Sequence, residues 1–186
     1  MKYNIAVIEG DGIGAEIVRE AIKVLDTVAT VANLEFDYTQ VKMGGASIDE
    51  FGVPLTDAAL VSCKEADAIL FGAVGDPKYD NNPDIKIRPE QGLLKLRKEL
   101  GLFSNIRPVK AYDFLLDQSP LKANRVKGVD LVIYRELTGG IYFGEKGITE
   151  DGGQAYDNCQ YTIEEVSRLL KLAFEAAQRR EKHLTV

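Results

Sequence analysis

The sequence has few of the residues on which small catalytic and metal sites commonly depend. Its 186 residues include one histidine, two cysteines and no tryptophan. With His183 as the single imidazole, neither a Ser–His pair nor a multi-histidine zinc site is expected. Cys63 and Cys159 lie far apart, in no metal or redox spacing. We therefore expect reduced thiols rather than a disulfide, and a cytoplasmic protein.

Long apolar runs and basic runs are absent as well. The longest apolar stretches, such as residues 68–71, are far too short to span a bilayer. Residues 1–4 lead directly into an apolar strand, so no signal peptide is expected. The net charge is −6 and no long run of Lys or Arg occurs. Charge and hydropathy therefore predict neither a nucleic acid nor a membrane as the main partner.

What the sequence does contain is enough apolar material for a core and a clear alternation of elements. Hydrophobic residues make up 45% of the chain. The periodicity predicts four strands, at residues 4–8, 34–38, 68–74 and 129–134, of which the last two should be buried. It also predicts four helices: at 17–28, after an N-cap at Thr56, at 89–101, and after a capping box formed by Thr162 and Glu165. Residues 75–88 read as a polar loop and residues 139–158 as a hairpin or protruding arm. This alternation predicts an α/β fold with at least a partly parallel sheet.

The last four residues, 183–186, have the pattern of a strand that begins as the chain stops. Such a segment after a finished helix suggests a chain cut in mid-architecture. A short terminal edge strand is the alternative.

A glycine-rich turn, IEGDGIGAEIV at residues 8–18, raises the question of a phosphate-binding loop. Gly10, Gly12 and Ala15 match the spacing of a dinucleotide-binding turn. That fold also needs an acidic residue at the tip of the next strand, whereas Glu35 and Asp37 lie on the polar face of theirs. The spacing therefore favours a tight turn whose glycines let a strand and a helix pack closely.

A second region combines charged and apolar residues on one helix. Glu90, Leu93, Leu94 and Arg97 recur at spacings of three and four and so share one face. A core face would be wholly apolar, and a solvent face would rarely carry paired leucines. The pattern fits a ligand-facing surface and, equally, a boundary face with leucines in the core and solvated charges.

Three arginines and a tyrosine complete the candidate site. We expect Arg97, Arg107 and Arg135 near strand ends, where guanidinium forks could hold a ligand with two or more carboxylates. Any one of them could instead form a surface ion pair. Tyr142 could act as a general acid, since a neighbouring positive charge lowers the pKa of a phenol, or it could pack in an interface.

Three motifs resemble one enzyme family along the whole chain. GDGIG at residues 10–14, PEQGLLKLRKELGLFSNIRP at 89–108 and RELTGGIYFGE at 135–145 are similar to the N-terminal half of the isocitrate/isopropylmalate dehydrogenase family. Its members are metal-dependent β-decarboxylating dehydrogenases and are much longer than this chain. The resemblance implies a two-domain, non-Rossmann fold that is incomplete here. Residues 1–106 would begin the first, NAD-side domain. Residues 107–186 would begin the second, dimerisation and substrate domain, with 139–158 as its arm.

The resemblance also implies an activity. It is the NAD-dependent oxidative decarboxylation of 3-isopropylmalate to 4-methyl-2-oxopentanoate in leucine biosynthesis, with Mg or Mn as the metal. Leu93 and Leu94 favour this substrate, because an apolar pocket disfavours the additional carboxylate of isocitrate. A tartrate or homoisocitrate dehydrogenase is the alternative within the family. A non-catalytic module that binds a dicarboxylate or a nucleotide is the alternative outside it.

Residue roles follow from the same resemblance. Arg97, Arg107 and Arg135 would bind the carboxylates of the malate unit, Tyr142 would protonate the carbon that loses CO2, and Glu90, Leu93 and Leu94 would face the isopropyl group and the nicotinamide. The cofactor would further contact Ile13, Asp76, Pro77, Lys78, Tyr79 and Asp80, much of it through the loop from Asp76 to Glu90. The catalytic lysine and the metal-binding aspartates of the family have no counterpart in this chain. We therefore expect no metal site and no turnover in the chain alone, and a homodimer in the complete enzyme.

Overall fold

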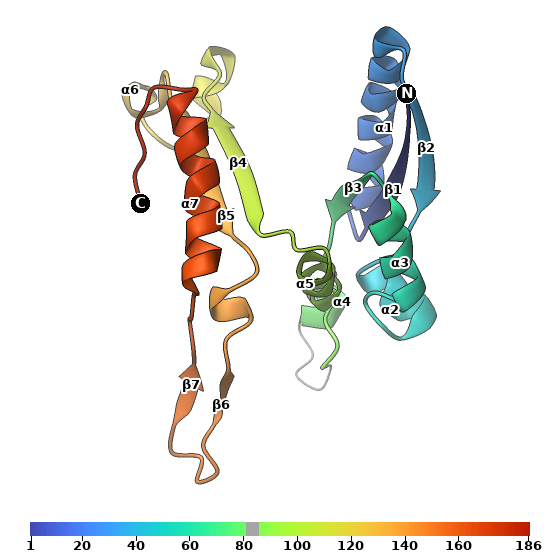
Figure 1. Cartoon of the computed structure of the whole chain (residues 1–186), viewed down its shortest axis with the longest axis vertical. Helices are drawn as coiled ribbons and strands as arrows, with labels where there is room; N and C mark the ends of the chain where they lie inside the picture. Colours follow the sequence, from blue (N-terminus) through green and yellow to red (C-terminus); the bar gives the residue numbers. More distant parts are fainter. Residues whose placement is uncertain (81–85) are drawn as a thin grey trace. The chain divides into compact units, whose positions relative to one another are not determined.

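The computed structural model describes residues 1–80 and 86–186. It is a mixed α/β structure, as predicted, and it divides into two compact units, Met1–Leu100 and Gly101–Val186 (Figure 1). The division after Leu100 precedes a strand, whereas the sequence prediction placed the boundary after residue 106, inside that strand. In the described part of the chain, no helix is both long enough and apolar enough to cross a membrane.

The first unit is built on a parallel three-stranded sheet in the order β2–β1–β3. Its strands are β1 (Lys2–Gly10), β2 (Glu35–Gln40) and β3 (Ala68–Ala73). Ile5 lies opposite Tyr38 on one side and Ala68 on the other. The run from Ile5 to Ile8 is buried without alternation, as expected for a central strand with both faces covered.

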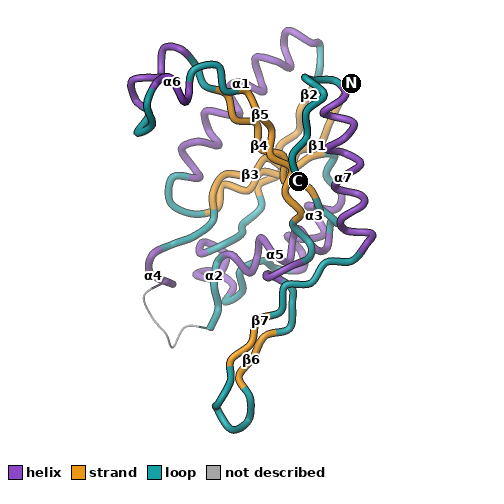
Figure 2. Tube along the Cα trace, turned by 90° about the vertical axis from the view of Figure 1, so that its left-hand side faces the viewer, coloured by secondary structure: helices purple, strands orange, loops and turns teal. Residues whose placement is uncertain are grey.

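Helices of the first unit pack on both faces of this sheet. Figure 2 colours the helices of this unit purple. They are α1 (Gly14–Ala32), α2 (Gly45–Phe51), α3 (Asp57–Glu65), α4 (Pro77–Asp80) and α5 (Glu90–Glu99). On one face Val18 of α1 packs against Ile5 and Val7. On the other, Ala6 and Ile8 belong to a cluster with Leu60 and Cys63 of α3 and Leu96 of α5. Successive β1 side chains thus enter two different cores.

Two predicted helix starts are confirmed, and one burial prediction is wrong. The Thr56 hydroxyl accepts the Ala59 N–H at 3.1 Å and caps α3. Pro89 occupies the N-cap of α5, and Gly101, with φ of 63°, follows its C-terminal end.

The strand predicted as buried, β3, is only half-buried, because among the described residues it pairs with β1 alone and leaves its other edge open.

The second unit is built on an antiparallel pair and one long helix. β4 (Ser104–Lys110) pairs with β5 (Asp130–Glu136), and α7 (Ile163–Gln178) packs along β5 (Figure 1). Short helices η1 (Asp113–Gln118) and α6 (Ala123–Val126) connect the strands, and η2 (Gly140–Tyr142) follows β5. The predicted arm is a hairpin of β6 (Lys146–Ile148) and β7 (Ala155–Asp157), and the predicted capping box of Thr162 and Glu165 starts α7.

β5 is less buried than predicted. Leu131 and Ile133 are 44% and 48% exposed. Glu136 forms an ion pair with Arg168 of α7, so its side chain points to the face of β5 that the helix covers. Val132 and Tyr134 point to the same face, because side chains alternate along a strand. The helix therefore covers one face of the strand and leaves Leu131 and Ile133 on the other.

The strand predicted to begin at 183–186 is not formed. α7 ends at Gln178, and residues 183–186 are irregular, with no strand of the described residues paired to them. The alternative, a short edge strand, is absent for the same reason.

Candidate functional site

Arg135 and Tyr142 meet in the second unit. The guanidinium Nη2 of Arg135 donates to the Tyr142 hydroxyl at 2.9 Å, and the guanidinium carbon Cζ lies 5.5 Å from the ring centroid. Arg135 is near the end of β5, and η2 returns Tyr142 to it seven residues later. A guanidinium can only donate, so the phenol oxygen is the acceptor and the phenol proton stays available to a ligand. The tyrosine is 47% exposed, which leaves it accessible.

A second arginine lies on the same face of the strand pair. The register places Asn105 opposite Arg135 and Arg107 opposite Ile133, so all four residues point to one side. Arg107 Nε donates to the Asn105 side-chain oxygen at 2.9 Å. Arg107 occupies the middle of β4, which corrects the expectation that it lies near a strand end. Sequence reasoning also assigned no role to Asn105, which orients Arg107.

Neither of these arginines is neutralised by a carboxylate within the described residues. Arg168 and Arg180, in contrast, form ion pairs with Glu136 and Asp130. For Arg107 and Arg135, the alternative of a surface ion pair therefore does not apply in the described chain. Two cationic forks on one face, next to a phenol with a free proton, form a site suited to carboxylate groups.

The remaining substrate candidates lie in the first unit, on α5. Gly92 and Leu96 face the core, and a Cβ added at Gly92 would lie 2.6 Å from the Pro54 carbonyl oxygen. Leu93 is half-buried and packs against the same core. Leu94 and Arg97 are half-buried and Glu90 is exposed. Of this shared face, Leu93 therefore contributes in part to the core.

Several cofactor candidates gather at the carboxyl edge of the parallel sheet. Gly10 and Ala73, the last residues of β1 and β3, are paired, so the segments carrying Ile13 and Asp76 leave the sheet side by side. A Cβ added at Gly75 would lie 3.0 Å from the Glu90 carboxylate, which places Glu90 at the same edge. Ile13 is 57% exposed there. Ligands of open α/β sheets commonly bind outside the carboxyl ends of strands.

The glycine-rich turn is a packing turn, as the spacing favoured. A Cβ at Gly10 would lie 1.8 Å from the Ala73 carbonyl oxygen, and one at Gly14 would lie 1.9 Å from that of Glu9. Both glycines therefore permit close contact of backbone with backbone. These contacts leave no phosphate cradle at the two positions.

Asp11, inside this turn, is a structural residue that sequence reasoning missed. Its carboxylate is buried and accepts the N–H groups of Gly45 at 2.9 Å, Ala46 at 3.0 Å and Gly75 at 3.0 Å. The side chain thereby ties the β1 turn to the start of α2 and to the segment after β3. Its partners lie 34 to 64 residues away in sequence, so no local pattern indicated them.

The residues predicted to contact the cofactor after Asp76 form α4, where two of them bind Asp49. Lys78 forms an ion pair with this carboxylate, and the Tyr79 hydroxyl donates to it at 2.7 Å. The hydrogen bond from Lys78, then that from Tyr79, holds the pKa of Asp49 below its usual value, while the bond to Asp49 raises the pKa of Tyr79. Pro77 and Asp80 bound the same short helix, and Asp80 lies 3.9 Å from Arg88. Residues 81–85 of the predicted cofactor loop lie outside the described residues.

Metal and thiol chemistry has little support in the described residues. They contain no group of three His, Cys, Asp or Glu side chains placed to hold a metal ion. Cys63 is buried, Cys159 is exposed, and both are free thiols.

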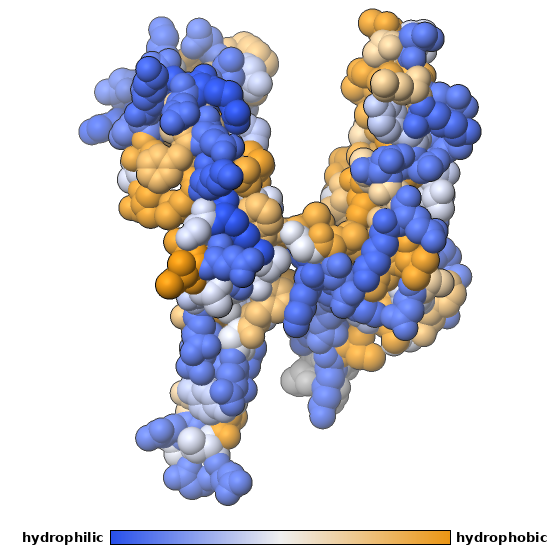
Figure 3. All heavy atoms as spheres, in the orientation of Figure 1, coloured by the Kyte–Doolittle hydropathy of each residue, from blue (hydrophilic) through white to orange (hydrophobic). Residues whose placement is uncertain are grey.

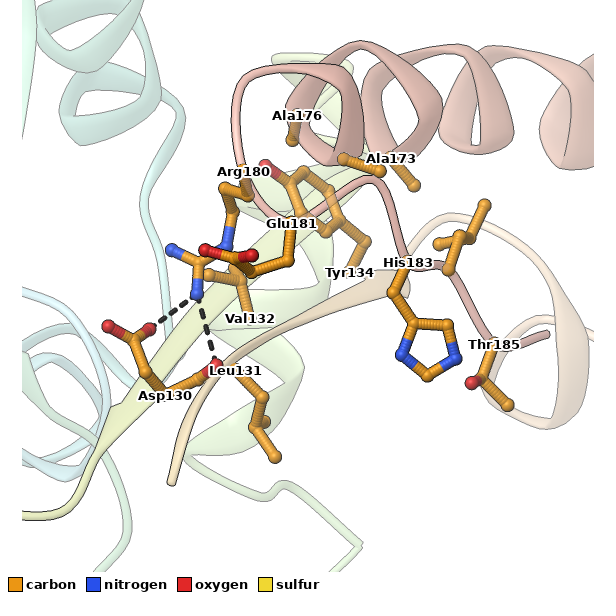
Figure 4. Close-up of a pocket in the computed structure, with 12 residues that line it drawn as sticks. Asp130, Leu131, Val132, Tyr134, Ala173, Ala176, Arg180, Glu181, His183 and Thr185 are labelled. Atoms are coloured by element: carbon orange, nitrogen blue, oxygen red, sulfur yellow. Dashed lines mark hydrogen bonds and ion pairs between the residues drawn. The ribbon is translucent and has the colours of Figure 1, made fainter. Parts of the chain in front are cut away.

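Two pockets adjoin β5. The first, of about 460 Å³, includes His183 and is closed at one side by the Arg180–Asp130 ion pair (Figure 4). The other, of about 430 Å³, is lined by Arg135 and Tyr142 and by apolar side chains of α7, including Leu169. Only this second pocket contains predicted site residues.

Comparison with known proteins agrees with the sequence resemblance. A model of the isocitrate/isopropylmalate dehydrogenase family matches residues 4–186. The chain is 51% identical over 187 residues to the 3-isopropylmalate dehydrogenase of Aquifex aeolicus, covering 99% of this chain and 51% of that protein. It is 53% identical over 187 residues to the 3-isopropylmalate dehydrogenase of Clostridium acetobutylicum, covering 99% and 52%.

Solved structures show the same fold. A β-decarboxylating dehydrogenase from Thermococcus kodakarensis has a TM-score of 0.65 and 34% identity, covering 96% of this chain and 46% of that one. Isocitrate dehydrogenase from Methylococcus capsulatus has a TM-score of 0.72 and 27% identity, covering 95% and 48%. The chain spans about half the length of the curated relatives it matches. By family match and identity together, it belongs to the isocitrate/isopropylmalate dehydrogenase family.

Proposed function

We propose that this chain carries the carboxylate-binding and proton-donating part of an enzyme that oxidatively decarboxylates 3-isopropylmalate to 4-methyl-2-oxopentanoate, with NAD as oxidant, in leucine biosynthesis. The observation that carries the proposal is the hydrogen bond between Arg135 and Tyr142. A cation that binds a carboxylate, next to a phenol whose proton can go to the carbon that loses CO2, fits the decarboxylation of such a substrate. The Aquifex aeolicus and Clostridium acetobutylicum relatives, 51% and 53% identical, are 3-isopropylmalate dehydrogenases, which supports this substrate over tartrate or homoisocitrate.

The residues act by binding, orienting and donating a proton. Arg107 and Arg135 hold carboxylate oxygens of the substrate through charged hydrogen bonds, each worth about 1.5–3 kcal/mol. Arg135 also fixes the phenol of Tyr142, whose hydroxyl then delivers its proton to the carbon from which CO2 departs. The family resemblance assigns a third guanidinium to Arg97 of α5. Hydride acceptance is the chemistry that NAD supplies when bound.

Specificity is assigned to the apolar residues of α5. Leu94 is half-buried next to Arg97 and has no place in the main core cluster, whereas Leu93 belongs to it in part. An isopropyl group gains from apolar contact there, while a desolvated third carboxylate is disfavoured. Ile13, Asp76 and Glu90, at the carboxyl edge of the sheet, are the residues that fit a nucleotide cofactor.

Further parts of the proposal rest on family membership. Mg or Mn is proposed as the metal, but because the described residues offer no three-ligand group, no step is assigned to it. We propose that the complete enzyme is a cytoplasmic homodimer and that the hairpin of β6 and β7 belongs to its interface. The chain alone is proposed to lack turnover.

The test follows NADH formation with 3-isopropylmalate, NAD and Mn²⁺. It compares this chain with the chain continued by the C-terminal half of the Aquifex aeolicus relative, with isocitrate and tartrate as parallel substrates. We expect no turnover by the chain alone and 3-isopropylmalate-selective turnover by the continued chain. Turnover by the chain alone, or a preference for isocitrate, would contradict the proposal. Tyr142→Phe in the continued chain should strongly lower turnover, with Tyr112→Phe, an exposed tyrosine without an assigned role, as the matched control.

A further inference from the structure

Glu136, next to Arg135 on β5, is a buried carboxylate without a role in the proposed chemistry. Its side chain is 6% exposed. It accepts four hydrogen bonds: from the N–H groups of Thr138 and Gly139 at 2.6 and 2.8 Å, from the Thr138 hydroxyl at 2.8 Å and from Arg168 Nη2 at 2.7 Å. A buried carboxylate is stable only when paired and fully hydrogen-bonded. Glu136 therefore fixes the turn that follows β5 and joins it to α7.

Arg168 is the partner that α7 contributes to this turn. It binds both Glu136 and the Thr138 hydroxyl, and its guanidinium lies 4.7 Å from the centroid of the Phe103 ring. The guanidinium is thus held between an aromatic face and a carboxylate. Arg168 thereby couples α7 to the turn.

The turn is fixed from a second side as well. Gly140 has φ of 72°, and a Cβ there would lie 2.3 Å from the Tyr161 hydroxyl. The Tyr161 ring therefore covers Gly140, where η2 begins and runs directly to Tyr142. Glu136 binds the turn before Gly140, and the Tyr161 ring lies against Gly140 itself. The backbone between Gly140 and Tyr142 therefore has little freedom, which fixes the position of the Tyr142 phenol.

The charges are arranged to keep Arg135 available. Arg135 and Glu136 are adjacent in β5 and point to opposite faces. Burial alone would raise the pKa of Glu136, but the bonds from Gly139, Thr138 and Arg168 outweigh it and hold this pKa below its usual value. Glu136 is thus ionised and bound by Arg168, so it does not compete with Tyr142 for the guanidinium of Arg135.

We propose that Glu136 and Arg168 are positioning residues, whose ion pair with its buried carboxylate fixes the turn at residues 137–140 so that Tyr142 meets Arg135 in the geometry that binds a dicarboxylate. The inference deepens the proposed function and rests on it for the identity of the ligand. The placement of Tyr142 itself does not depend on that identity.

The experiment uses the full chain labelled with 3-fluorotyrosine, with the Tyr142 resonance among the eight tyrosines assigned through Tyr142→Phe. Glu136→Gln removes the charge at constant shape, and Arg168→Lys keeps the charge but loses the fork. Glu175→Gln, an exposed carboxylate elsewhere on α7, is the matched control. Each variant is recorded at a temperature where circular dichroism shows it folded, and then titrated with 3-isopropylmalate.

We expect Glu136→Gln to shift and broaden the Tyr142 fluorine resonance and to weaken 3-isopropylmalate binding about tenfold, the scale of one charged hydrogen bond. Arg168→Lys should give an intermediate shift and an intermediate affinity. Glu175→Gln should change neither. A merely structural pair would lower the unfolding temperature but leave the resonance and the affinity of the folded chain unchanged.

Failure of the two proposals can be told apart. An unmoved Tyr142 resonance in both folded variants overturns the positioning inference, whatever the ligand does. A moved resonance in a chain that binds no 3-isopropylmalate upholds the positioning of Tyr142 and overturns the proposed substrate. If Glu136→Gln does not fold, Arg168→Lys alone decides in the same way.

Discussion

The two units differ in how far each buries its own apolar residues. Among the described residues, twelve of the fifteen buried hydrophobic side chains lie in the first unit, and the three in the second are Leu137, Ala173 and Ala176. The first unit covers its sheet with helices on both faces, whereas the second covers its strand pair with α7 on one. Figure 3 shows apolar side chains at the surface of both units. The comparison indicates that the first unit is stabilised mainly by its own apolar core and the second mainly by ion pairs and hydrogen bonds, such as that of Glu136 with Arg168.

The sites follow the same division. In the first unit the candidate residues stand on a packed helix and at a sheet edge that Asp11 ties together. In the second, Arg135 and Tyr142 are held by a strand, a turn and the ion pair of Glu136 with Arg168. The second site therefore depends on fewer interactions, each of which should matter more to ligand binding.

The largest expected effect compares two strand isoleucines. Ile8→Ala removes a fully buried side chain from the core of the first unit and should cost about 3 kcal/mol of unfolding free energy. Ile133→Ala, 48% exposed on β5, should cost less than about 1 kcal/mol. Urea unfolding followed by circular dichroism measures both, with hydrogen exchange of β1 and β5 peptides assigning the loss to a unit. Equal costs would contradict the division.

A smaller effect is expected at Asp11. Asp11→Asn leaves one oxygen for three backbone donors and should cost about 2 kcal/mol, since bonds to charged groups contribute about 1.5–3 kcal/mol. The control is Asp57→Asn, which breaks an exposed pair with Lys95 and should leave the unfolding free energy nearly unchanged. Urea unfolding gives the totals. Hydrogen exchange of the Gly45 and Gly75 amides should accelerate only in the Asp11 variant. Unchanged exchange in that variant would contradict a role of the Asp11 carboxylate in holding these two segments together.

The parts of the fold that could be predicted are those with strong local patterns. β1, α1 and the caps at Thr56 and Thr162 follow from periodicity and capping chemistry, which depend on residues near in sequence. β4 was missed because Pro108 interrupts it. Proline cannot donate to a strand ladder, but it is tolerated at an edge, and among the described residues β4 pairs with β5 alone.

The burial of strands and the contacts between distant residues could not be predicted from the sequence. β3 and β5 have apolar sequences typical of buried strands, but exposure depends on what covers them, which no window of sequence contains. The pairing of Arg135 with Tyr142 could be suspected from their short separation. That Arg107 shares their face requires the register of β4, and that Asp11 binds Gly75 requires the packing of three loops.

A pH effect of intermediate size should separate the units further. The pKa of Glu136 is lower in the folded chain than when unfolded, so its ionised form stabilises the fold. The stabilisation is complete above the unfolded pKa and is lost as pH falls through the folded one. Glu136→Gln should therefore lower the unfolding temperature at pH 6, by an amount equivalent to about 1–2 kcal/mol. Thermal scans from pH 6 to pH 3 should show this difference shrinking, and a difference constant with pH would contradict the assignment.

The smallest expected effect tests whether the difference between the units is one of tertiary packing alone. Thr56 caps α3 in the first unit and Thr162 caps α7 in the second, each through one hydroxyl bond to the third residue on. Alanine at either position should cost about 1 kcal/mol, with serine restoring most of it, because capping is local to a helix end. Urea unfolding of the four variants measures this. If Thr162→Ala costs much more than Thr56→Ala, α7 must do more than cover β5. Glu165, which closes the capping box at 2.7 Å and would lie 2.9 Å from a Cβ at Gly139, would then link the helix start to the turn that places Tyr142.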